Sequence, residues 1–131
     1  ATAAGIATLR LADAGVYDRV DAAAALLSAE VTAALTRAGV PHRLQRAGSL
    51  FSVFIGLDSP VRDYATAQQQ DTGAFAAFFH AMLDAGIALP PSAYEAWFVS
   101  AAHDHAVVER IIEALSQAAE AAARALVSSR S

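Results

Sequence analysis

The chain lacks cysteine and lysine altogether, and each absence excludes a kind of chemistry. Without cysteine, its 131 residues can form no disulfide framework and offer no thiolate nucleophile. All nine basic residues are arginine, so no side chain can supply the lysine amine that a Schiff base requires. The arginines are scattered and the net charge is −4. Nucleic-acid binding, which usually depends on clustered positive charge, is therefore disfavoured.

Long apolar runs are also missing. No segment approaches the ~20 apolar residues of a membrane-spanning helix, and the first five residues lack the basic start of a signal peptide. We therefore expect a cytoplasmic protein without membrane contact. The chain begins inside a helical pattern, as though it had been cut from a longer protein.

The composition is that of a globular protein, with 56% hydrophobic and 17% charged residues. The length suffices for one domain with a core, and no internal repeat or linker divides it. We expect a single domain over residues 1–131. Its 35 alanines predict small, smooth helix surfaces that pack closely on one another or on a partner.

The first half predicts two helices and a hairpin. A helix over Thr2–Ala14 would end at Gly15, and a second over Val16–Ala38 would end before Pro41. The second helix has apolar residues at intervals of three and four, which defines a buried face: Val16, Val20, Ala24, Leu27, Val31, Leu35 and Ala38. Two strands, His42–Arg46 and Leu50–Gly56, would be joined by a turn at Ala47-Gly48. The apolar second strand is expected to be buried on both faces.

The second half predicts two further helices and two short strands. After a loop or short helix at Asp63–Gln70, Asp71 is a suitable N-cap for a helix that Gly86 closes. One side of that helix is apolar and is expected to lie in the core: Phe75, Phe78, Phe79, Met82 and Leu83. Short strands are predicted at Ile87–Leu89 and Trp97–Ala101.

Asp104 is the predicted N-cap of the last helix, whose polar tail, Ser128–Ser131, should fray. The order helix, helix, strand, strand, helix, strand, strand, helix indicates an α+β domain. We expect a small, mostly antiparallel sheet of three to four strands, covered by helices on one face.

Glu95 is the main candidate for a functional side chain. It is a lone carboxylate between aromatic residues, Tyr94 and Trp97, and it follows a proline turn at Pro90-Pro91. A lone acid in such surroundings is either a solvated residue at the rim of the turn or a group that the function needs. The residues alone leave both interpretations open.

The histidines predict no metal site. His103 and His105 are two residues apart, so they point to opposite sides of a strand or about 200° apart on a helix. We expect a strand-to-helix junction in which His103 is packed and His105 is solvated. His80 continues the aromatic stripe beside Phe79, and we expect it to be a partly buried packing residue.

Four blocks of sequence follow one another along the chain: Gly48-Ser49-Leu50-Phe51, Phe78-Phe79-His80-Ala81-Met82-Leu83, Pro91-Ser92-Ala93-Tyr94-Glu95-Ala96 and Phe98-Val99-Ser100-Ala101-Ala102-His103. Together, in this order and spacing, they resemble the C-terminal part of glutamate-1-semialdehyde aminomutase. The opening residues, Ala1–Leu9, are similar to a helix of the same family. Three residues depart from the family's usual pattern, namely Leu50, Tyr94 and Trp97, the last standing where a small residue is common.

This resemblance implies a homodimeric pyridoxal-phosphate enzyme of fold type I. The family isomerises glutamate-1-semialdehyde to 5-aminolevulinate, the precursor of tetrapyrroles such as porphyrins, through a lysine Schiff base. The lysine and the other cofactor contacts would lie upstream of this segment. The chain would then be the C-terminal small domain, whose partners are the missing N-terminal and cofactor domains. Alone it should neither hold the cofactor nor turn over substrate.

The resemblance also implies a substrate-binding role for Glu95. Related aminotransferases commonly place arginine in this region to hold a substrate carboxylate. A glutamate would instead attract an amine and repel a carboxylate. Two alternatives remain: a stand-alone α+β interaction or regulatory module, and the small domain of another class-III aminotransferase. The latter would predict arginine near position 95.

Overall fold

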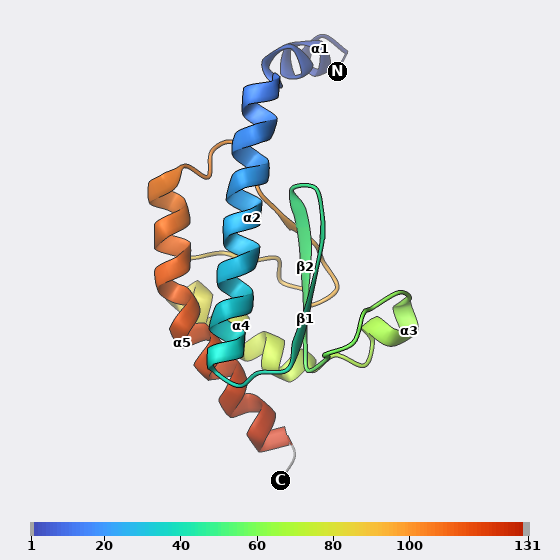
Figure 1. Ribbon diagram of the computed structural model, residues 1–131, viewed down its shortest axis with the longest axis vertical. Coiled ribbons are helices and arrows are strands. Elements are labelled where there is room, and N and C mark those ends of the chain that lie inside the picture. The colour runs from blue at the N-terminus through green and yellow to red at the C-terminus, as the bar shows by residue number, and fades with distance from the viewer. Residues whose placement is uncertain (1, 130–131) are drawn as a thin grey trace.

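The computed structural model describes residues 2–129, and Figure 1 shows their arrangement. Across these residues the strands form one antiparallel sheet in the order β1-β2-β3. The elements follow the chain as α1 (Thr2–Leu11), α2 (Ala14–Arg37), β1 (His42–Ala47), β2 (Leu50–Ile55), α3 (Tyr64–Ala67), α4 (Thr72–Asp84), β3 (Trp97–Phe98) and α5 (His105–Ser129).

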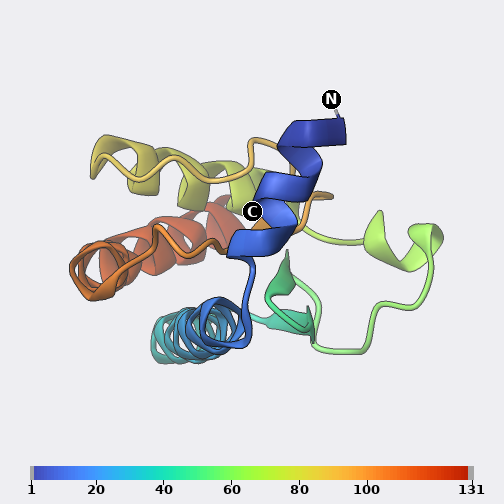
Figure 2. The ribbon, with the colours of Figure 1, turned by 90° about the horizontal axis from the view of Figure 1, so that it is seen from above.

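The sheet has one face covered by helices and one open face. Helices α2, α4 and α5 lie together on one side, whereas α3 stands away from them beyond the sheet (Figure 2). The expected α+β class, with a three-stranded antiparallel sheet and helices on one face, is confirmed.

The strand register assigns side chains to these two faces. Phe51 pairs with Trp97, and both are buried, whereas the next pair, Leu50 and Phe98, points to the open face. Phe98 is 74% exposed. Because successive side chains of a strand point to opposite faces, β2 alternates between partly exposed and buried positions. The expectation that β2 is buried on both faces is therefore wrong.

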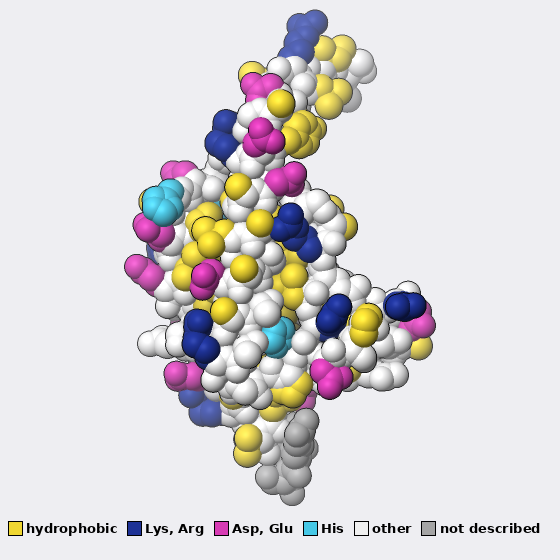
Figure 3. Space-filling model, viewed as in Figure 1, with side chains coloured by type: hydrophobic (Ala, Val, Ile, Leu, Met, Phe, Trp, Pro, Cys, Tyr) yellow, Lys and Arg dark blue, Asp and Glu magenta, His cyan; other side chains and the backbone are white. Residues whose placement is uncertain are grey.

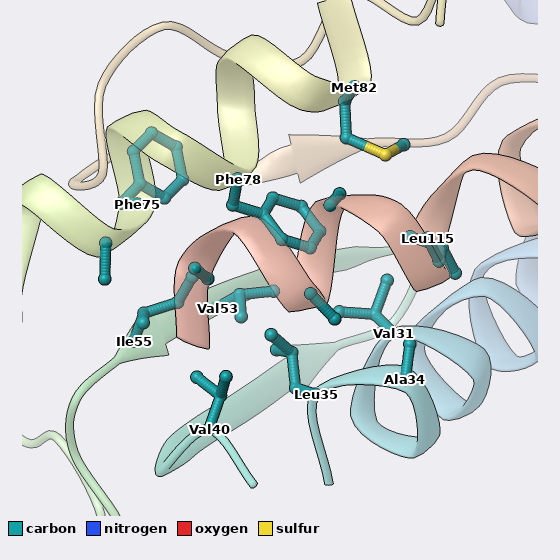
Figure 4. Packing of buried hydrophobic residues seen from close by; sticks show 14 of the residues in the cluster. Val31, Ala34, Leu35, Val40, Val53, Ile55, Phe75, Phe78, Met82 and Leu115 are labelled. Carbon is teal, nitrogen blue, oxygen red and sulfur yellow. The ribbon is translucent and has the colours of Figure 1, made fainter. Parts of the chain in front are cut away.

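The covered face and its helices share one apolar core, part of which Figure 4 shows. Phe78 and Met82 come from α4, Leu115 comes from α5, and α4 and α5 make the most extensive contact between elements. Most of the expected helix positions thus lie in the core, but Val16 and Val20 are only partly buried and Leu83 is exposed. The largest fully buried side chains are Phe51, Phe78, Leu35, Ile55, Met82, Leu115 and Val31.

Capping aspartates set the beginnings of three long helices. The carboxylates of Asp71 and Asp104 accept backbone N–H bonds at 2.8 and 3.0 Å, as expected. Asp13 does the same at 2.9 Å and begins α2 at Ala14. The predicted helix end at Gly15 is therefore wrong, because Gly15 lies within the first turn of α2.

The hairpin turn lies one residue later than expected. Ala47 pairs with Leu50, so the turn is Gly48-Ser49 and not Ala47-Gly48. Gly48 has a φ of 60°, in the left-handed region that glycine adopts readily. This glycine therefore sets the position of the turn, and Ala47 remains in the strand.

The two strands predicted in the second half are shorter or missing. Residues 87–89 form no strand, because the Ile87 N–H donates to the Met82 carbonyl at 2.9 Å and closes α4. The last strand ends at Phe98 and not at Ala101. A turn follows it, in which the His103 N–H donates to the Ser100 carbonyl at 3.0 Å.

Helix α1 projects beyond the rest of the domain (Figures 1 and 3). None of its residues is buried, and Ile6, Leu9 and Leu11 are exposed. At the other end, α5 continues through Ser129, and residues 130–131 of the predicted frayed tail lie outside the described residues. Within residues 2–129, no helix is long and apolar enough to cross a membrane.

Candidate functional site

Glu95 ends a tight turn that follows the two prolines. Its N–H donates to the Ser92 carbonyl at 3.1 Å, and the Tyr94 N–H donates to the Ser92 hydroxyl at 3.2 Å. Ala93, between them, is buried in the core cluster and ties the turn to it. The Glu95 side chain is exposed, and it forms no ion pair or side-chain hydrogen bond with residues 2–129. Its carboxylate is therefore available to a group from outside this chain.

Trp97 is buried, unlike Glu95 two positions before it. The residue is 7% exposed, and its ring lies 5.2 Å from the ring of Phe51 and 6.3 Å from that of Phe78, measured between centroids. The large side chain therefore fills the core on the covered face of the sheet. The departure from a small residue at this position therefore adds a large aromatic side chain to the core.

Two hollows flank the turn. Ala96 lines a hollow of about 340 Å³ and Tyr94 lines another of about 380 Å³, so Glu95 stands in the chain between them. The first hollow is lined mainly by the hairpin: Gln45, Arg46, Ala47, Leu50, Phe51 and Ser52. The second is lined mainly by α4 and the turn itself: Thr72, Phe75, Ala76, Phe79, His80, Pro91, Ser92 and Ala93.

Comparison with known proteins gives a consistent result. No family model matches the chain. It is 56% identical over 126 residues to glutamate-1-semialdehyde 2,1-aminomutase of Cutibacterium acnes. These residues make up 96% of this chain and 29% of that protein. It is 54% identical over 128 residues to the same enzyme of Propionibacterium freudenreichii, again 29% of that protein. The resemblance to glutamate-1-semialdehyde 2,1-aminomutase is confirmed. The chain spans about 29% of the length of these aminomutases.

Solved structures similar to this segment include transaminases and a protein in its pyridoxal-phosphate form. An omega-transaminase from Sphaerobacter thermophilus matches 91% of the chain with a TM-score of 0.79 at 25% identity. The pyridoxal-phosphate internal aldimine form of the FumI protein of Sphingopyxis sp. matches 96% with a TM-score of 0.75 at 26% identity. The chain covers 27% and 28% of those two proteins. Pyridoxal phosphate is therefore a cofactor of proteins that contain this fold.

The aminomutase-like block that ends at His103 forms a local junction. The Ser100 N–H donates to His103 Nδ1 at 3.1 Å, and His105 is exposed and lies 3.1 Å from Glu109. In the part of the chain that the structure describes, no group of three or more metal-binding side chains occurs. His80 is exposed, with its ring edge-on to Phe79 at 5.4 Å, so the prediction of a partly buried packing residue is wrong.

The sequence reasoning missed one contact beside the aminomutase-like block. The ring of Tyr64, in α3, lies 5.9 Å from the ring of Tyr94, in the turn that carries Glu95. The two tyrosines are far apart in the sequence, and no local pattern links them. The sequence indicated only the short helix that carries Tyr64, because Asp63 stands before it in a position typical of an N-cap.

Proposed function

We propose that this chain is the C-terminal small domain of a glutamate-1-semialdehyde 2,1-aminomutase. The observation that carries the proposal is the 54–56% identity over nearly the whole chain. The solved transaminases are only 23–26% identical, which favours the aminomutase over another class-III aminotransferase. The whole enzyme would isomerise glutamate-1-semialdehyde to 5-aminolevulinate, as a homodimer in the cytoplasm.

The residues of this chain do not provide the attachment for pyridoxal phosphate. The cofactor is held covalently by a lysine in enzymes of this kind, and all nine basic residues here are arginine. The remaining part of the parent enzyme would therefore hold it. This domain would contribute one wall of the substrate site.

Glu95 would be the substrate-binding residue on that wall. Its exposed carboxylate can accept charge-assisted hydrogen bonds from a substrate amine, and it repels a carboxylate in the same place. The tight turn and buried Ala93 hold the backbone at this point. Because a carboxylate in water interacts weakly, its effect depends on the desolvated site that the rest of the enzyme would create around it.

The first test is Glu95→Gln in the full-length enzyme. Loss of one charge-assisted bond to the substrate should lower kcat/KM for glutamate-1-semialdehyde by roughly 10- to 100-fold. The unfolding midpoint should not change, because the side chain is exposed. Glu113→Gln, which changes an exposed carboxylate on α5, is the matched control. Wild-type kinetics for Glu95→Gln would remove Glu95 from the site.

The second test concerns the 131-residue chain alone. Titration with pyridoxal phosphate should give no internal-aldimine absorbance band, because no lysine is present to form the bond. The α-amine can give a weak signal, so the control is the same chain with that amine acetylated. A saturable one-to-one band that survives acetylation would contradict the assignment of the cofactor to the rest of the enzyme.

A further inference from the structure

The residues between β2 and α4 form a loop that is tied to the open face of the sheet. This 57–70 loop contains α3 (Figures 1 and 2). The side chain of Gln45 holds it through two hydrogen bonds to one residue. Gln45 Nε2 donates to the Val61 carbonyl at 2.9 Å, and the Val61 N–H donates to Gln45 Oε1 at 2.6 Å. Gln45 pairs with Ser52 across the hairpin, so it lies on the open face.

The tip of the 57–70 loop has its own local support. The Asp63 carboxylate accepts bonds from both the N–H and the hydroxyl of Thr66, each at 2.7 Å. These bonds lower the pKa of Asp63 below its ordinary value, the backbone bond contributing most. The four residues of α3, which begin at Tyr64, are therefore held by a capped first turn.

Tyr64, the first residue of α3, contacts the turn that carries Glu95. Its ring and that of Tyr94 have centroids 5.9 Å apart and planes inclined by 45°. This is within the range of favourable aromatic pairs. Tyr64 is 67% exposed and Tyr94 45%, so neither ring is needed to fill the core. The contact joins two segments that are distant in the sequence, and Glu95 is the residue directly after Tyr94.

We propose that Tyr64 is a positioning residue for Glu95, acting through the ring of Tyr94. The inference rests on the proposed substrate-binding role of Glu95. The Ser92–Glu95 turn has two short-range hydrogen bonds and buried Ala93 on one side. The Tyr64 ring supplies a contact from the 57–70 loop, which Gln45 in turn fixes to the sheet. Binding groups function best when held to about 0.5 Å, and small misplacements lower rates strongly.

The test is a double-mutant cycle in the full-length enzyme with glutamate-1-semialdehyde as substrate. Tyr64→Ala should lower kcat/KM about 3- to 10-fold, the range expected from loss of an aromatic pair. Tyr64→Phe, which keeps the ring, should stay near wild type. In the Glu95→Gln background, Tyr64→Ala should have almost no further effect, because there is no carboxylate left to position.

The outcomes separate the two proposals. If Glu95→Gln lowers kcat/KM but Tyr64→Ala lowers it by the same factor in both backgrounds, Tyr64 acts independently and the positioning inference is wrong. Wild-type kinetics for Tyr64→Ala would overturn it as well. If Glu95→Gln itself has wild-type kinetics, the substrate-binding role fails and the positioning role fails with it. Should Tyr64→Ala not fold, Tyr64→Leu, which keeps an apolar side chain without an aromatic ring, takes its place with the same expectations.

Discussion

The two faces of the sheet differ in what their side chains contact. On the covered face, Phe51 and Trp97 pack on each other and on α4, and almost no surface remains exposed. On the open face, Phe98 is exposed, and the side chain of Gln45 holds the 57–70 loop. The same strands therefore provide stability on one side and, under the proposed function, a surface for another part of the enzyme on the other.

Substitutions on the two faces of the sheet should consequently have different effects, on stability for one face and on function for the other. Adjacent residues of β3 illustrate this, because Trp97 lies in the core and Phe98 lies in solvent. Glu95, two positions before Trp97, is also exposed. Substitutions on the covered face should lower the free energy of unfolding, and those near the turn should change substrate kinetics.

The largest expected effect comes from the same substitution made on each side of the sheet, at Phe78 in the covering helix α4 and at Phe98 on the open face. Phe78→Ala should lower the free energy of unfolding by about 3–5 kcal/mol, because it leaves a cavity at a side chain that is 1% exposed. Phe98→Ala should change it by no more than about 0.5 kcal/mol. Urea denaturation of this chain measures both. Similar losses for the two variants would contradict the division between the two faces.

A smaller effect, of opposite sign, is expected at the end of the 57–70 loop. Gln70 is 5% exposed, and its side-chain amide has no hydrogen-bond partner among the described residues. Gln70→Met keeps the shape and removes the unpaired polar atoms, so it should raise the free energy of unfolding by about 1–3 kcal/mol. Gln69→Met, at an exposed neighbour, is the control and should change nothing. A loss of stability for Gln70→Met alone would show that the amide is bound.

Asp71 joins the 57–70 loop to α4, one of the helices that cover the sheet. Substitutions at Asp71 therefore test the connection between the loop and the covered side. Asp71→Ala should lower the free energy of unfolding by about 1 kcal/mol, since it removes the N-cap bond to Ala74. Asp71→Asn, which can still accept that bond, should lower it less. Thermal unfolding of the three proteins compares them. Equal losses for the alanine and asparagine variants would assign the effect to charge and not to capping.

The smallest effect concerns the pH dependence of the 57–70 loop. Because the pKa of Asp63 is lowered in the folded chain, its contribution is present at neutral pH and is lost as pH falls through that lowered pKa. A carbon-detected NMR titration should show the Asp63 carboxyl titrating below an ordinary aspartate. Thr66→Val, which keeps the backbone bond and removes the hydroxyl bond, should raise the pKa part of the way. An ordinary pKa in the unaltered chain would contradict this account of α3.

Local patterns predicted the helices well. Apolar residues at intervals of three and four marked the buried side of α2, and Asp71 and Asp104 marked helix beginnings, because periodicity and capping depend on residues a few positions apart. Gly15 misled the prediction, since glycine is typical of helix ends but Asp13 caps α2 first.

Features that depend on distant residues could not be predicted in this way. The apolar residues Ile87–Leu89 suit a strand, but the Ile87 N–H closes α4 instead of joining the sheet. For Glu95, the sequence left open whether the side chain is solvated, and the structure places it in an exposed turn beside buried Ala93. The contact between Tyr64 and Tyr94 depends on how the 57–70 loop folds over the hairpin.

The Asp13 cap has a practical consequence for protein engineering. It marks the break between α1 and α2, and among the described residues every buried one lies at Ala24 or later. A crossover placed at Ala12-Asp13 would therefore exchange α1 without touching the core. Chimeras between related aminomutases and transaminases could be joined at this point, so that each domain keeps its own interior.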